Sequence, residues 1–210
     1  MKKLLSLLLS AILVFSICSF SASAKTPASN SDFVISYTAT GKLIDKKGNV
    51  TLVTGYRRNT PMATNMLSDN YSVSYDYTIP LNNLTHEDKL TGTDKTYYLK
   101  ASLTVYYTEY DRKPKEYLMT GVSASWSDPL PTDRTFVSET GTISAISDGI
   151  GSTAVWPGES MSVSVTSNQY VNTGFLYPIG ESYGMMGATL TIGIRMGQES
   201  WTLELENYPI

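Results

Sequence analysis

Tyrosine is the most informative chemical feature of this sequence. The chain carries 15 tyrosines and 3 tryptophans, and Tyr98 and Tyr106 fall on positions that an alternating strand would turn to solvent. Tyr110 follows close to the next turn. Aromatic rings contact the C–H patches of sugars or peptides, while their hydroxyl groups form hydrogen bonds. These three tyrosines are therefore candidate ligand-binding residues, although tyrosine also favours strands for packing reasons alone.

A second candidate binding surface lies between residues 174 and 187. This segment is apolar, punctuated by glycines, and includes Met185 and Met186. Such a segment can form an adaptable contact with a ligand, a membrane or a partner protein. The candidate contact residues are Phe175, Tyr177 and Tyr183. The same segment could instead cross an open end of the core and seal it, and this structural role is favoured.

His86 is the only histidine and therefore limits the catalytic chemistry. A serine-hydrolase triad would have to use it as the base, and the chain lacks a Gly-x-Ser-x-Gly elbow. Cys18, the only cysteine, lies in the N-terminal apolar run, so the rest of the chain offers no thiolate or disulfide. One histidine without cysteines would make an unusual zinc site. We interpret His86 as a surface-loop residue.

Paired carboxylates are the remaining route to catalysis. Glu204 and Glu206 are two residues apart, as are Glu109 and Asp111. Glycoside hydrolysis needs two carboxyl groups about 5 to 9.5 Å apart, and residues i and i+2 of a strand share one face within that range. The alternation of apolar and polar residues on a half-buried strand explains the same spacing. An extracellular hydrolase is accordingly the weakest of the functions considered.

Calcium would use oxygen ligands from turns. Asp128 with Asp133, or Asp45 with Asn49, could contribute to such a site, but neither stretch matches the twelve-residue calcium loop. Turn-forming Asp and Asn have the same distribution without an ion. We therefore expect no metal and no cofactor.

The elements that would position these residues show a period of two. In residues 96–108, apolar side chains alternate with Tyr, Lys, Ser and Thr, as expected for a strand with one buried face. Arg112 to Lys115 supplies a turn around Pro114, and a second strand follows from Glu116 to about Ser127. Another hairpin is predicted around Lys46 to Asn49. Residues 62–68 could form a helical turn or two.

Alternation recurs along most of the chain, with the clearest examples at residues 71–79, 161–165, 188–196 and 201–205. Abundant Ser, Thr, Val and Tyr suit pleated surfaces. About nine to eleven short strands, with no crossover helix between them, indicate an all-β domain. We predict a single antiparallel β-sandwich, Ig-like or jelly-roll-like, spanning residues 25–210.

Residues 1–24 have the pattern of a cleaved secretory signal peptide. Lys2 and Lys3 precede an apolar run, and Ala22 and Ala24 provide the small side chains that signal peptidase accepts, with cleavage expected after Ala24. An uncleaved anchor would need about 20 predominantly apolar residues, and serines interrupt this run. The protein is therefore expected to be secreted, and extracellular or associated with the cell envelope.

Charge excludes one class of partner. The chain has 16 basic and 19 acidic residues and a formal net charge of −3. A nucleic-acid partner is not expected at this sign. Only Arg134 and Arg195 follow Lys115 among basic residues. This asymmetry can mark an interaction surface, although an acidic, solvated face that maintains solubility would produce it too.

These observations predict a secreted, non-catalytic module that binds extracellular polysaccharide, a cell-envelope component or a partner protein. The alternative from another class is a membrane-acting, pore-forming toxin-like protein, in which Ser/Thr-alternating strands such as residues 160–167 rearrange. That segment is shorter than the 9 to 11 residues, roughly, that a membrane-spanning strand requires. Membrane contact is thus weakly supported.

Overall fold

The computed structural model describes residues 36–58, 70–80, 98–127, 135–149, 157–181, 184–196 and 198–210. All of them belong to one compact unit, Phe33–Ile210. Within these ranges the secondary structure is β-strand, with no helix. No helix in the described ranges is long and apolar enough to span a membrane. The predictions for residues 62–68, His86, Asp128 and Asp133 lie outside the described residues.

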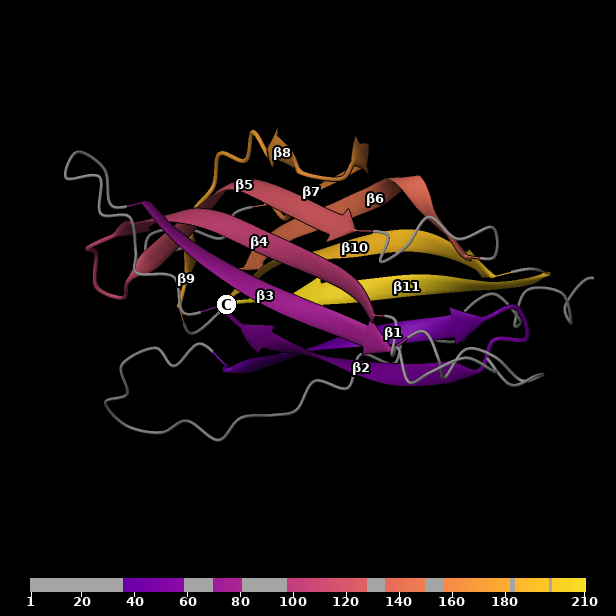
Figure 1. Cartoon of the computed structure of the whole chain (residues 1–210). Helices are drawn as coiled ribbons and strands as arrows, with labels where there is room; N and C mark the ends of the chain where they lie inside the picture. Colours follow the sequence, from indigo (N-terminus) through magenta and orange to yellow (C-terminus); the bar gives the residue numbers. More distant parts are fainter. Residues whose placement is uncertain are drawn as a thin grey trace, which may run out of the picture. The chain divides into compact units, whose positions relative to one another are not determined.

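The strands are β1 (Thr38–Asp45), β2 (Val50–Arg57), β3 (Asn70–Pro80), β4 (Tyr98–Tyr110), β5 (Glu116–Ser127), β6 (Thr135–Gly149), β7 (Glu159–Thr166), β8 (Gln169–Asn172), β9 (Ile179–Gly180), β10 (Gly184–Met196) and β11 (Glu199–Asn207). They form one sheet in the order β7-β6-β10-β11-β1-β2-β3-β4-β5-β8, and β9 pairs with β5. Figure 1 shows this sheet curling, so that β3, β4 and β5 lie on one side of β10 and β11.

The predicted all-β, antiparallel fold is confirmed, because every strand pair in the sheet is antiparallel. The predicted sandwich is not confirmed. A sandwich has two separate stacked sheets, whereas the described strands follow one continuous hydrogen-bonded path. Local alternation predicts which face of a strand is buried, but it does not distinguish two stacked sheets from one sheet that curls over its own core.

Alternating apolar side chains form the core inside the curl. On β4, Leu99, Leu103 and Val105 are fully buried, as the sequence predicted for this face. Leu190 of β10 and Leu203 of β11 are equally buried on the facing part of the sheet. Burying such side chains is worth about 1.5–3 kcal/mol each. The outward positions of the same strands are left for Ser, Thr, Tyr and charged residues.

Two polar side chains join distant strands inside the curl. The Tyr77 ring crosses the glycines of β2 and β1: a Cβ on Gly55 would lie 2.5 Å from the ring, and one on Gly41 would lie 3.3 Å from it. The Tyr77 hydroxyl donates to the backbone oxygen of Glu206. Asn207 Nδ2 donates to backbone carbonyls on β3 and β4, at 2.8 Å each. The end of β11 is thereby joined to β3 and β4.

The two edge strands of the sheet are neighbours in sequence. Only Ser167 and Asn168 separate β7 from β8, although the strands sit at opposite ends of the strand order. Ser167 Oγ donates to the Trp126 carbonyl at 2.6 Å. Near the start of β7, the Glu159 carboxylate accepts the backbone N–H groups of Leu176 and Tyr177 at 2.9–3.0 Å. These contacts hold the edges in place at both ends of β7.

Both predicted hairpins are present. β1 pairs with β2, and β4 pairs with β5. In the first turn, the Asp45 carboxylate accepts the backbone N–H groups of Lys47 and Asn49 at 2.8 Å and the Asn49 amide at 2.6 Å. The hydrogen bonds from Asn49 lower the pKa of Asp45. This network explains the Asp45 and Asn49 combination as turn chemistry.

Candidate ligand-binding face

The outward residues of β3, β4, β5 and β8 form a continuous surface, which we call the tyrosine-framed face. The strand register sets their side chains in rows across the sheet. The first row holds Tyr106 and Gly121, and the second holds Ser74, Thr104, Ser123 and Tyr170. The third row holds Asp76, Ser102 and Ser125. The fourth holds Thr78, Lys100 and Ser127, and Tyr98 lies in the fifth. Neighbouring strands are about 4.8 Å apart, so the side chains of each row are adjacent.

Small hydroxyl groups occupy the middle of this face and bond to one another. Ser102 Oγ lies 2.7 Å from Ser125 Oγ, and Thr104 Oγ1 donates to Ser74 Oγ at 2.9 Å. Ser74 and Ser102 are buried, whereas Thr104, Ser123 and Ser125 are half-buried. Since a hydroxyl group both donates and accepts hydrogen bonds, these three half-buried residues are the part of the floor with which a hydroxyl-rich ligand could form hydrogen bonds.

An aromatic pair borders this floor on one side. The rings of Tyr106 and Tyr170 meet edge to face with centroids 5.3 Å apart, and the Tyr106 hydroxyl lies 3.1 Å from Ser123 Oγ. The Tyr170 ring lies over Gly121, where a Cβ would come within 2.3 Å of the phenolic oxygen. Glycine at this position is thus what lets the ring lie flat on the sheet. Tyr170 remains 53% exposed.

Tyr98 borders the floor on the other side and is 42% exposed. Tyr106 lies eight positions further along β4, a span of about 27 Å at the usual rise of a strand. Both side chains point to the same face because their spacing is even. Tyr56 of β2 adds a further exposed ring beside Asp76, its partner in the register. Tyrosine rings thus lie at both ends of the face and at one flank.

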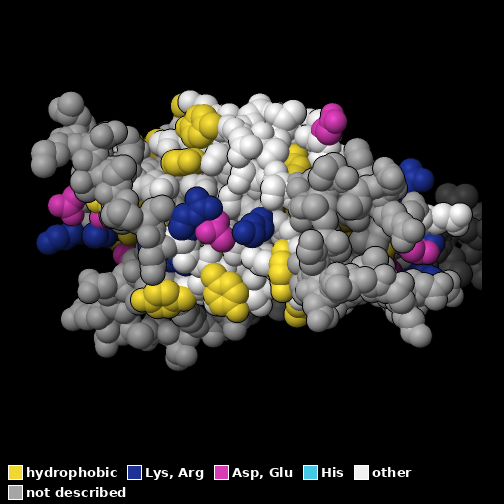
Figure 2. All heavy atoms as spheres, viewed as in Figure 1, with side chains coloured by type: hydrophobic (Ala, Val, Ile, Leu, Met, Phe, Trp, Pro, Cys, Tyr) yellow, Lys and Arg dark blue, Asp and Glu magenta, His cyan; other side chains and the backbone are white. Residues whose placement is uncertain are grey.

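Charge is concentrated near the centre of the face. Arg58 Nε donates to Asp76 Oδ2 at 2.8 Å, and this hydrogen bond raises the pKa of Arg58. Lys100 lies on the neighbouring strand, next to the Ser102 position. Figure 2 shows basic side chains on either side of an acidic one in the middle of this view, with hydrophobic side chains around them.

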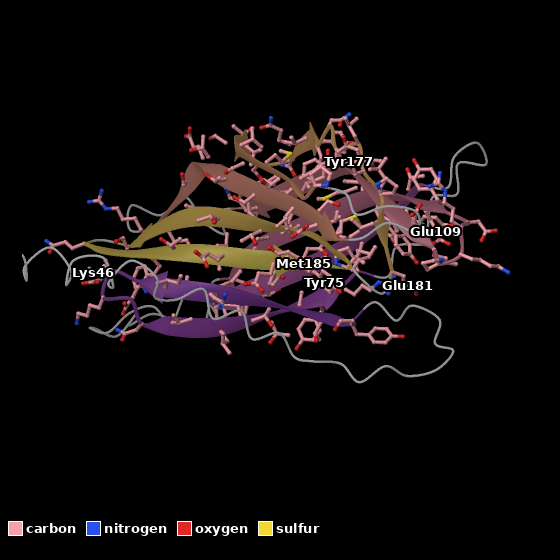
Figure 3. All side chains as sticks on the ribbon, turned by 180° about the vertical axis from the view of Figure 1, so that it is seen from behind. Lys46, Tyr75, Glu109, Tyr177, Glu181 and Met185 are labelled. Carbon is pink, nitrogen blue, oxygen red and sulfur yellow. The ribbon has the colours of Figure 1, made fainter. Side chains whose placement is uncertain are left out.

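The structure brings some of the candidate residues predicted from the sequence together on one face and places the others elsewhere. Tyr98 and Tyr106 lie together on the face. Tyr110 lies at the far end of β4, where the Arg112 guanidinium sits 5.5 Å above its ring. Phe175 is buried in the core. Tyr177 is half-buried and lies in the half of the view away from Lys46 (Figure 3). Tyr183 lies outside the described residues.

Sequence reasoning missed Tyr170 and Tyr56. Tyr170 belongs to β8, which spans only four residues, too few for alternation to reveal a strand. The β2 segment does alternate, with Val50, Leu52 and Tyr56 all exposed, and this pattern could have identified Tyr56 as an outward side chain.

One carboxylate of each predicted pair forms an ion pair with a lysine. Glu206 Oε1 accepts from Lys42 Nζ at 2.9 Å, and the pKa of Lys42 is raised, first by this hydrogen bond. Glu109 Oε1 accepts from Lys115 Nζ at 2.6 Å, with the same effect on the pKa of Lys115. The described residues contain no group of three His, Cys, Asp or Glu side chains that could hold a metal ion.

Comparison with known proteins adds no relative. No protein-family model, curated protein or solved structure matches this chain.

Proposed function

We propose that this chain is a secreted, non-catalytic module that binds extracellular polysaccharide through the tyrosine-framed face. Secretion rests on the signal-peptide pattern of residues 1–24, with its basic start, apolar run and small residues at Ala22 and Ala24. Binding rests on the arrangement of the face. The observation that carries the proposal is the placement of Tyr98, Tyr106 and Tyr170 around a floor of hydroxyl groups.

The chemistry of the face fits a sugar polymer. A pyranose ring has C–H patches that pack on aromatic rings and a rim of hydroxyl groups that need hydrogen-bond partners. Tyr98 and Tyr106 are about 27 Å apart on β4, so a ligand that contacts both must be extended. A polymer chain lying along β4 would meet a ring, then hydroxyl groups, then a second ring.

The test is co-sedimentation of the purified chain with insoluble cell-wall polysaccharide and, in parallel, with lipid vesicles. We expect pelleting with polysaccharide that falls at least five-fold in Tyr98→Ala and in Tyr106→Ala. Tyr208→Ala is the matched control, because Tyr208 is exposed to nearly the same extent as Tyr98 and lies on β11's C-terminal side, away from this face. The control variant should pellet as the unchanged chain does.

Other results would redirect the proposal. Pelleting with vesicles alone would favour the membrane-acting alternative. Pelleting with neither material would contradict a polysaccharide-binding module and leave a soluble partner protein as the expected ligand. Equal losses in Tyr98→Ala and Tyr208→Ala would mean that binding does not occur at the tyrosine-framed face.

A further inference from the structure

We infer that the polysaccharide bound by the tyrosine-framed face is acidic, carrying carboxylate or other anionic substituents, and that Lys100 determines this specificity. The inference rests on the proposed function, because it names the ligand class of the same face. It draws on the charges of the face, which the proposed function does not use.

Lys100 is not among the five ion-paired cations of the described residues. Lys42, Lys46, Arg58, Arg112 and Lys115 each form an ion pair with a carboxylate. Lys100 makes no ion pair with any residue that the structure describes. Lys47 and Lys113 share this property but occupy turns. Arg57 also shares it, but it follows the spacing of the buried Val53 and Gly55 on β2. Lys100 instead lies within β4 and is exposed on its outward side. An ammonium group is therefore available on the face itself.

The surroundings of Lys100 suit an anion. Its partners in the register are Thr78 and Ser127, whose hydroxyl groups can donate hydrogen bonds beside the ammonium group. The one carboxylate on the neighbouring row, Asp76, is already paired with Arg58. The outward positions of β3, β4 and β5 between Ser72 and Ser127 otherwise hold uncharged side chains. Among the described residues of the face, Arg58, Asp76 and Lys100 sum to a charge of plus one.

The net charge of the whole chain opposes the binding of an acidic polymer, so the local positive charge must outweigh it. A protein with a formal net charge of −3 repels polyanions at long range. An acidic polymer would bind only where a local cation and hydrogen-bond donors outweigh that repulsion, and charge-assisted hydrogen bonds are roughly twice as strong as neutral ones. A neutral polysaccharide could accept only ordinary hydrogen bonds from the Lys100 ammonium group, whereas an acidic one would also gain a charge-assisted hydrogen bond. The geometry therefore favours the acidic ligand.

Tyr98 and Lys100 would act on one sugar unit or on neighbouring units. They are two residues apart on the same face of β4, about 7 Å along the strand. The ring would pack against a sugar face while the ammonium group binds the acidic substituent. Because Lys100 is exposed, salt should weaken its contribution.

The test compares matched acidic and neutral polymers. Dissociation constants are measured for polygalacturonic acid against its methyl ester, and for carboxymethyl cellulose against hydroxyethyl cellulose, with the unchanged chain, Lys100→Gln and Lys100→Arg. We expect at least five-fold tighter binding of the acidic member in at least one pair. Lys100→Gln should abolish this preference, and Lys100→Arg should retain it. Lys47→Gln, in the β1–β2 turn, is the control and should leave the preference unchanged.

The outcomes separate this inference from the proposed function. Equal binding of acidic and neutral polymers, lost in Tyr98→Ala, would overturn the inference and support the binding module. An acidic preference that persists in Lys100→Gln would overturn the role of Lys100. Absence of binding to all four polymers would contradict both proposals. Circular dichroism spectra of the variants should match that of the unchanged chain, because Lys100 is exposed.

Discussion

At the scale of single residues, Tyr77 does more than fill the core. Its ring takes the space that side chains would need at Gly41 and Gly55, and its hydroxyl group donates to the backbone of β11. Burial raises the pKa of Tyr77 well above its usual range. The Tyr77 ring fills the space left by the two glycines. This fit allows a side chain of β3 to reach β11 across β2 and β1.

We expect Tyr77→Phe to lower the free energy of unfolding by about 1–2 kcal/mol, because the backbone oxygen of Glu206 would lose its donor while the ring still packs. Gly55→Ala should cost more than Tyr77→Phe, because the added Cβ would meet the ring at 2.5 Å. Denaturation in urea measures both. The control is Tyr56→Phe, at an exposed neighbouring position, which should change stability by less than about 0.5 kcal/mol. Equal effects at positions 56 and 77 would contradict a structural role for the buried hydroxyl group.

At the scale of elements, the sequence predicts strands where apolar contrast is strong. β4, β5, β10 and β11 alternate large apolar side chains with polar ones, and their buried faces match the prediction. β6 is harder to recognise, because Gly141, Ala145 and Ser147 occupy inward positions and reduce the contrast. β8 and β9 span four and two residues and are defined by their pairing with β5.

The candidate face was predictable only in part, because local alternation reveals the direction of a side chain but not which strands lie side by side. Tyr98 and Tyr106 are identified from one strand, since alternation alone sets their direction. The pairing of Tyr106 with Tyr170 depends on β8 lying beside β5, a contact between segments about 50 residues apart in the chain, and no local pattern encodes it. Phe175 has the composition of a contact residue, and only the packing of its segment over the core distinguishes a sealing role.

The Glu159 carboxylate joins the start of β7 to the segment that follows β8, and its removal should loosen that segment. Its carboxylate binds two backbone N–H groups after β8, so Glu159→Ala should leave both without this acceptor. We expect faster amide hydrogen exchange at Leu176 and Tyr177, with exchange at Val105 in the centre of β4 unchanged, because the opening is local. The control is Glu139→Ala, an exposed carboxylate on β6. Unchanged exchange at 176 and 177 would mean that Glu159 does not hold the segment.

At the scale of the whole molecule, buried tyrosines make stability depend on pH in the alkaline range. Burial raises the pKa of Tyr107 to about 12, and it raises the pKa values of Tyr77 and Tyr117 as well. Tyr107 also lies in an aromatic cluster, stacked on Tyr71 and edge-on to Tyr117, with centroids 5.7 Å apart in each case. The folded core therefore excludes phenolate, whereas the unfolded chain accepts it near pH 10.

The sign of this effect follows from proton binding. Above pH 10 the unfolded chain loses phenolic protons that the folded chain retains, so the stabilisation is complete below pH 10 and is lost as pH rises through 10 toward 12. A shift of this size at Tyr107 alone corresponds to about 3 kcal/mol. We expect the urea midpoint to fall steeply over this interval, with phenolate absorbance from the buried rings appearing together with unfolding. Tyr107→Phe should lose less stability than the unchanged chain between pH 10 and 12, because it removes one titrating group. A slope equal to that of the unchanged chain would show that Tyr107 ionises without unfolding the sheet.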